Sequence, residues 1–162
     1  MERRPQLEPG QQIGDYLLKE LISEGTATRT WYAEQISVRR EVILDSLRRV
    51  IMENEDVREA FLEDVRAKAR VDHPLIGSVF EAVKKEDICF YARERLAGET
   101  LEKVIESWEK LSPQAVAYIL RQIAEAYLHM ESHNIGSIPI GPHQIYLGDK
   151  HLTIRVRCLS PR

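Results

Sequence analysis

Hydrophobic and polar residues in the first third of the chain are arranged in short runs that predict β-strands. Each run combines apolar, β-branched or aromatic residues with charged ones over the length of a strand. The runs cover residues 16–22, 30–35 and 41–47, and the turn residues 23–26 separate the first two. We therefore expect these strands to form an antiparallel meander.

A helical period replaces this pattern after Asn54. Apolar residues recur at helical spacing over residues 57–69 with charges between them, and Pro74 ends the helix. Two further strands are expected at residues 78–83 and 88–93. The amino-terminal part therefore reads as five strands and one helix.

The second part of the chain combines helices with a short hairpin. Thr100 is a plausible N-cap, and Ser112 followed by Pro113 is a strong signal for a helix start. The predicted elements are a helix at 101–109, a helix from Ser112 to about His133, a loop at 136–142 and strands at 145–147 and 152–156.

Composition narrows the class of protein. The chain has 162 residues, of which 43% are hydrophobic and 30% charged, and its formal net charge is −3. This balance gives no strong field for nucleic acid, so no nucleic-acid partner is expected. Two distant cysteines exclude a disulfide scaffold, and no apolar run reaches the roughly 20 residues of a membrane span. A cytoplasmic protein without a membrane span is expected.

Several segments resemble, in the same order, motifs of protein kinase domains of the bacterial, eukaryotic-like Ser/Thr type. They are 61–67 with Val71 to Ile76 (regulatory helix and "HPNIV"), 94–101 (hinge), 123–129 ("AL-x-YLH"), and 145–147 with 151–154 ("NILL…HLKL"). The resemblance implies an α+β, kinase-like fold. A five-stranded antiparallel N-lobe sheet with one regulatory helix would be followed by an incomplete helical C-lobe.

The resemblance also implies a domain organisation. Residues 1–14 would be a flexible tail and residues 15–97 the N-lobe. Residues 98–162 would form a partial C-lobe of two helices, a degenerate catalytic loop and a β-hairpin. Because the chain ends six residues after Val156, we expect a truncated domain, too short for a complete kinase.

The catalytic positions that the resemblance assigns carry unsuitable residues. Asp45 stands at the phosphate-binding lysine, Asp64 at its glutamate partner, Pro139 at the aspartate base, Gln144 at the metal-binding asparagine and Val156 at the metal-binding aspartate. A carboxylate repels phosphates, proline offers no proton acceptor, and valine cannot bind Mg²⁺. No catalytic residue, metal ligand or cofactor is therefore expected.

A vestigial nucleotide cleft is expected around Gly25, Asp45, Arg93 and Glu94. Gly25 is the one glycine left of the phosphate-binding loop, and Glu94 begins the hinge segment. Arg93 lies on the strand beside the cleft, where we expect it to pair with Asp45 or Asp64 and fill the space. Arg155, near the carboxyl end, reads as part of a solvated basic face.

Histidines raise one alternative. His129 and His133 lie four residues apart on a predicted helix, with His143, His151 and Cys158 nearby in sequence, so a metal site is conceivable. The order His-Met-Glu-Ser-His is not the zincin motif, and His129 also fits the "YLH" pattern. We expect no metal.

The functional expectation is a catalytically inactive, pseudokinase-type signalling module. Its partner would be another protein, or a second copy bound through an exposed apolar face of the partial C-lobe. The alternatives are a divergent Ser/Thr kinase, a domain that still binds ATP with Mg²⁺, and a remnant of the kinase fold without a function of its own.

Overall fold

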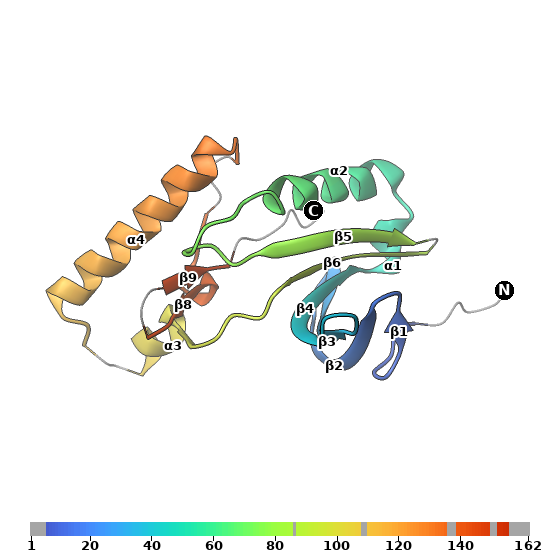
Figure 1. Ribbon diagram of the computed structural model, residues 1–162, viewed down its shortest axis with the longest axis horizontal. Helices are drawn as coiled ribbons and strands as arrows, with labels where there is room; N and C mark the ends of the chain where they lie inside the picture. Colours follow the sequence, from blue (N-terminus) through green and yellow to red (C-terminus); the bar gives the residue numbers. More distant parts are fainter. Residues whose placement is uncertain (1–5, 86, 108–109, 136–138, 150–151, 156–162) are drawn as a thin grey trace.

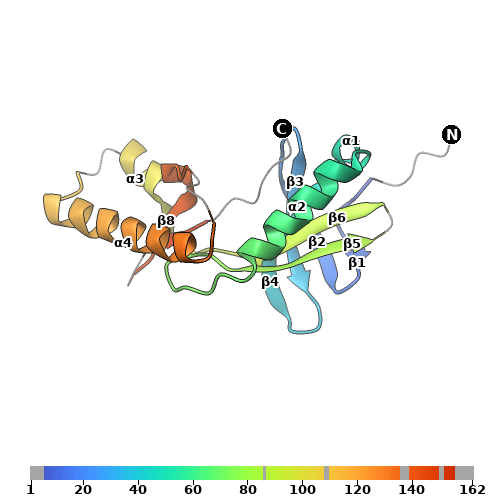
Figure 2. The same cartoon turned by 90° about the horizontal axis from the view of Figure 1, so that it is seen from above.

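The computed structural model describes residues 6–85, 87–107, 110–135, 139–149 and 152–155. A curved sheet with one long helix forms one half of the molecule, and two further helices with short strands form the other (Figures 1 and 2). This mixed α and β architecture agrees with the fold class expected from the sequence.

The large sheet is antiparallel and has the strand order β1-β2-β3-β4-β6-β5. Its strands are β1 (Gln12–Ile13), β2 (Tyr16–Glu24), β3 (Thr28–Gln35), β4 (Arg40–Leu47), β5 (Val79–Lys85) and β6 (Ile88–Glu94). The five longer strands are those predicted from the sequence pattern. Trp31 and Leu44, exposed by 1% and 0%, pack with Phe90 in a core on this sheet.

Strand β1 corrects the expectation of a flexible tail over residues 1–14 for the described residues 6–14. Ile13 pairs with Tyr16 of β2 and is buried. The Gly10 amide also donates to the Leu18 carbonyl at 2.8 Å. A two-residue strand has no detectable period, so the pattern could not predict it.

Helix α2 (Glu55–Lys68) covers part of the large sheet, after the short α1 (Arg49–Met52) (Figure 1). The Asn54 side chain caps its first turn by accepting a hydrogen bond from the Val57 amide at 3.1 Å. Phe61 and Val65 are buried in a cluster that includes Tyr91 of β6. The helical spacing of these apolar residues thus becomes the face that packs on the sheet.

The second half contains helices and a small sheet. Its elements are β7 (Glu99–Thr100), α3 (Leu101–Glu106), α4 (Pro113–Ser132), the 3₁₀ turn η1 (Pro142–Gln144), β8 (Ile145–Leu147) and β9 (Leu152–Ile154). Thr100 and Ser112 cap α3 and α4, as the sequence predicted. Strand β7 was not predicted; it pairs with β8 through Glu99 and Leu147.

The segment before β5, in the first half of the molecule, is hydrogen-bonded to β9 in the second half. The Ile154 amide donates to the Leu75 carbonyl, and the Gly77 amide donates to the Ile154 carbonyl, both at 2.8 Å. Leu75 and Ile76 are buried in the same cluster as Ala126 of α4. These contacts fix the start of β5 against β9. Among the described residues no helix is long and apolar enough to cross a membrane.

Candidate functional site

A cavity of about 660 Å³ includes Arg93, one of the four residues that the sequence placed around a vestigial nucleotide cleft, whereas Gly25, Asp45 and Glu94 do not line it. Its walls come from β2, β3, β4 and β6, from the segment after β6, and from β8 and the residue after β9. The lining residues are Ile22, Ser23, Thr30, Tyr32, Glu41, Ile43, Arg93, Arg95, Leu96, Ala97, Gly98, Tyr146 and Arg155. A cavity of this size and mixed lining is large enough for a small molecule.

Asp45 and Arg93 form a buried ion pair at this cavity. Arg93 Nε donates to Asp45 Oδ2 at 2.8 Å, and the two side chains are 10% and 8% exposed. Thr30 Oγ1 donates to the other carboxylate oxygen of Asp45 at 2.5 Å. Burial lowers the pKa of Arg93, but the Asp45 carboxylate together with Tyr91 and Tyr146 raises that pKa on balance. Of the two partners that the sequence allowed for Arg93, the structure selects Asp45.

Asp64 lies in a different pair. Its Oδ2 accepts a hydrogen bond from Lys68 Nζ at 2.6 Å, one turn along α2. Lys68 is only 4% exposed, so this pair is largely removed from water. The carboxylates of Asp45 and Asp64 therefore each face a cation of their own.

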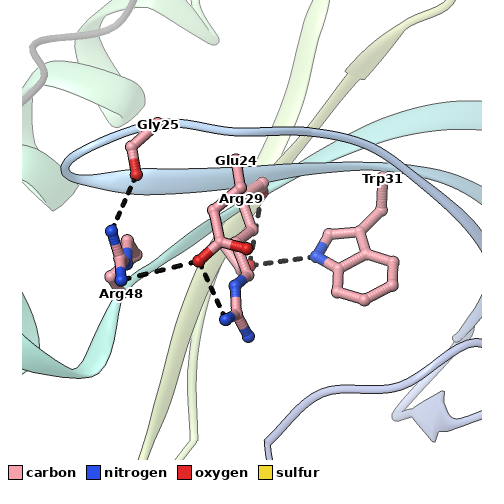
Figure 3. A network of polar contacts seen from close by, with 6 residues as sticks. Glu24, Gly25, Arg29, Trp31 and Arg48 are labelled. Atoms are coloured by element: carbon pink, nitrogen blue, oxygen red, sulfur yellow. Dashed lines mark hydrogen bonds and ion pairs between the residues drawn. The ribbon is translucent and has the colours of Figure 1, made fainter.

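The turn that contains Gly25 is closed by its own hydrogen bonds (Figure 3). The Gly25 amide donates to the Thr28 carbonyl at 2.8 Å, and Arg48 Nη1 donates to the Gly25 carbonyl at 3.1 Å. Glu24 lies between Arg48 and Arg29, at 3.5 and 3.0 Å. A phosphate-binding loop offers free backbone amides, whereas the Gly25 amide already donates to a carbonyl of its own turn.

Glu94 is directed away from the cavity, toward the start of β5. Its Oε2 accepts from the Ser78 amide at 2.9 Å, and its own amide donates to the Ser78 carbonyl at 2.8 Å. Glu94 does not line the cavity, although the neighbouring Arg93 and Arg95 do. Its role is therefore to join β6 to the chain before β5.

Gln144, the residue at the asparagine position, is 1% exposed and has both ends of its amide bonded. Its Oε1 accepts from the Gly141 amide at 3.1 Å, and its Nε2 donates to the Arg155 carbonyl at 3.0 Å. Gln144 thus joins the η1 turn to the end of β9. Pro139 is exposed, and Val156 lies outside the described residues.

Arg155 departs from its expected place on a solvated face. It is partly buried, it lines the cavity, and its Nε is enclosed without a hydrogen-bond partner. Burial, and then the positive charge of Arg93, lower the pKa of Arg155. The sequence pattern could not predict the partial burial of Arg155, because strand β9 is too short to show a period. The available signal was that Arg155 directly precedes Val156, the position that the resemblance assigns to the metal-binding aspartate.

The rings of three histidines, two of them at the end of α4, contact one another in a row with tilted planes. The rings of His73 and His129 have centroids 4.5 Å apart, as do those of His129 and His133. No group of three or more His, Cys, Asp or Glu residues within the described ranges could hold a metal ion. His143 is exposed, and His151 and Cys158 fall outside those ranges.

Sequence comparison finds relatives among Ser/Thr protein kinases. PrkC of Bacillus subtilis is 28% identical over 134 residues, which is 83% of this chain and 21% of the relative. The kinase pkn3 of Myxococcus xanthus is 29% identical over 124 residues, or 76% of this chain and 22% of the relative. ATG1a of Arabidopsis thaliana is 26% identical over 91% of this chain and 23% of the relative. The chain spans less than a quarter of the length of these relatives.

Comparison with solved structures agrees on the fold. The structure described as "PpkA-294 apo form" superimposes with a TM-score of 0.75 at 15% identity, covering 93% of this chain and 61% of that one. No family model matches the chain. The chain therefore has a protein-kinase-like fold, and the sequence relatives named above are Ser/Thr protein kinases.

Proposed function

We propose that this chain is a catalytically inactive, pseudokinase-type domain that acts through protein contacts and does not bind Mg²⁺·ATP. The observation that carries the proposal is the buried pair of Asp45 and Arg93. In phosphoryl transfer a lysine at this position holds the nucleotide phosphates. Here a carboxylate occupies the position, and its charge is committed to a neighbouring arginine.

The residues at the positions that the resemblance assigns to phosphate and metal binding do not suit Mg²⁺·ATP. The Gly25 amide is already bonded to the Thr28 carbonyl, and Gln144 Oε1 already accepts from the Gly141 amide. Mg²⁺ is normally held by carboxylate oxygens together with substrate phosphates. Pro139 offers no side-chain group that could accept a proton. Together these features support the loss of both binding and transfer.

The surface of α4 supports a role in protein contacts. Val116, Tyr118, Leu120 and Leu128 are 40%, 51%, 60% and 67% exposed. Apolar side chains gathered on one exposed helix are a common mark of an interface. The same helix buries Ala126 and Met130 against the core, so its other side is the available one.

Nucleotide binding is the direct test of inactivity. Thermal unfolding is measured with ATP, with ATP and Mg²⁺, and with ATP and Mn²⁺. A ligand at one hundred times its Kd would stabilise the fold by about 2.7 kcal/mol, a shift of several degrees. We expect no shift in any condition. A metal-dependent rise in Tm would overturn the proposal and favour the alternative of a domain that still binds ATP.

Light scattering after size exclusion tests the protein-contact role. The wild type and a Leu120→Ser, Leu128→Ser double variant are compared over a range of concentrations, alone and with candidate partners. We expect the wild type, but not the variant, to form a larger species with itself or with a partner. Equal behaviour of the two proteins would remove α4 as the contact surface.

A further inference from the structure

The charges around the cavity do not cancel. Arg93 is paired with Asp45, and Arg95 is paired with Glu41, which also lines the cavity. Arg155 is the third arginine of the lining and has no ion-pair partner among the described residues. The cavity therefore presents one surplus positive charge.

Arg155 is held firmly at this place by its backbone. Its amide donates to the Gln144 carbonyl at 2.8 Å, and its carbonyl accepts from Gln144 Nε2 at 3.0 Å. Its Nε is enclosed and lacks a hydrogen-bond acceptor. The enclosed Nε itself is out of reach of the cavity, but the Arg155 side chain lines the cavity and its positive charge would attract an anion bound there.

The remaining walls suit a flat apolar body. Ile22, Ile43 and Leu96 supply aliphatic surface, and Tyr32 and Tyr146 supply aromatic rings. The guanidinium of Arg95 lies 4.9 Å from the centre of the Tyr32 ring, which fixes that wall. The volume of about 660 Å³ fits one or two fused rings with their substituents.

We propose that this cavity binds a small aromatic acid, with its carboxylate against Arg155 and its ring between the apolar walls, and without a divalent metal. This rests on the proposed function, in which the cleft no longer takes Mg²⁺·ATP. A single carboxylate matches the single surplus cation, whereas a triphosphate brings several negative charges that one unpaired arginine does not balance.

Calorimetry with matched probes tests the proposal on the wild-type protein. The probes are 2-naphthoate, the neutral 2-naphthamide of nearly the same shape, and AMP, which carries its anion on a nucleotide. We expect 2-naphthoate to bind about tenfold more tightly than 2-naphthamide, in EDTA as well as in Mg²⁺. Equal binding of the two naphthalene probes, no binding of either, or tighter binding of AMP would overturn the proposal.

A substitution assigns the site. Arg155→Met keeps an unbranched apolar stem but removes the charged guanidinium, and Arg121→Met on the exposed face of α4 is the matched control. We expect Arg155→Met to lose the preference for 2-naphthoate over 2-naphthamide, and Arg121→Met to keep it. An unchanged preference in Arg155→Met would place the ligand elsewhere and reject the site. If Arg155→Met does not fold, the comparison of probes on the wild type still decides.

The two proposals fail in different ways. Metal-dependent binding of ATP would refute the proposed loss of nucleotide binding, whatever the naphthalene probes do. Failure of 2-naphthoate to bind, with ATP also inert, would refute only the aromatic-acid site.

Discussion

Arg93 and Asp45 lie on adjacent strands, β6 and β4, and their side chains meet at 2.8 Å at the cavity, almost out of contact with water. Two buried charges of opposite sign attract strongly but have lost their hydration. Removing one partner leaves the other charge buried without a counter-ion. The pair therefore holds the two strands together, and the charge of Arg93 is offset by Asp45.

Arg93→Met should destabilise the fold by about 3 kcal/mol, because Asp45 would stay buried with Thr30 as its remaining hydrogen-bond donor. The double variant Asp45→Leu, Arg93→Met should recover much of this loss, since no charge is then buried. Unfolding in urea, followed by tryptophan fluorescence and circular dichroism, measures both values.

Arg95→Met is the control for this pair. Arg95 is paired with Glu41, but their side chains are 47% and 65% exposed, so the loss should be about 0–1 kcal/mol. If Arg93→Met cost no more than Arg95→Met, the pair of Asp45 and Arg93 would have no special weight in the fold.

Gln144→Asn should also destabilise the protein, although it introduces the residue that kinases carry at this position. The shorter side chain cannot reach both the Gly141 amide and the Arg155 carbonyl, so at least one buried group loses its partner. The expected cost is about 1–3 kcal/mol in urea unfolding. Gln12→Asn, at an exposed site, should change stability by less than about 0.5 kcal/mol. Equal effects would show that Gln144 is not a structural bridge.

The sequence predicted the fold well where elements are long. The five longer strands and helices α2 and α4 have enough residues to show a hydrophobic period. The capping residues Asn54 and Ser112 also mark where the two helices begin. The two-residue strands β1 and β7 exist because they pair with neighbours, and pairing leaves no local pattern.

For the candidate site, the sequence indicated individual residues but could not specify which groups they contact. Arg93 could be expected to pair with Asp45 or Asp64, because the kinase resemblance places it on the strand beside the cleft, but only the structure distinguishes the two partners. The bridging role of Gln144 and the buried Nε of Arg155 depend on how η1 and β9 approach each other. Such an approach is a tertiary fact with no counterpart in residue spacing.

Arg48→Met should loosen the turn around Gly25 without unfolding the domain. Arg48 binds the Gly25 carbonyl and Glu24 from one side of this turn (Figure 3). Hydrogen exchange of the amides at residues 23–28 should become faster, while global stability falls by less than about 1 kcal/mol. Arg49→Met, whose pair with Glu53 spans 3.8 Å between highly exposed side chains, should leave this exchange unchanged. No change in Arg48→Met would mean that the backbone bonds alone close the turn.

Stability should fall as the pH is lowered through the range in which histidine titrates. Burial, and then the neighbouring His73 and His133, lower the pKa of His129, and Asp72 opposes them only in part. The unfolded chain therefore binds this proton at a higher pH than the folded one. The stabilisation is complete above the ordinary histidine pKa of about 6.5 and is lost as the pH falls toward the lower folded value.

His129→Gln should remove part of this pH dependence, because glutamine does not take up a proton. Urea unfolding at a series of pH values between about 7.5 and 5.5 measures the slope. His143→Gln, at an exposed position away from the stacked rings, should keep the slope of the wild type. If His129→Gln kept it too, the dependence would arise from other groups.

Cys89 should report opening of the contact between α2 and the sheet. Its side chain is fully buried in the cluster that contains Phe61, and burial raises its pKa to about 11. The thiolate is the reactive form, so at a pH below the ordinary thiol pKa of about 8.5 the folded thiol should react about 100-fold more slowly than an unfolded one from its pKa alone. In a Cys158→Ser variant, alkylation should therefore proceed only as fast as the structure opens, and urea should accelerate it along the unfolding curve. Reaction in the native state at the rate of the denatured chain would contradict the burial of Cys89, and with it the packing of α2 on β6.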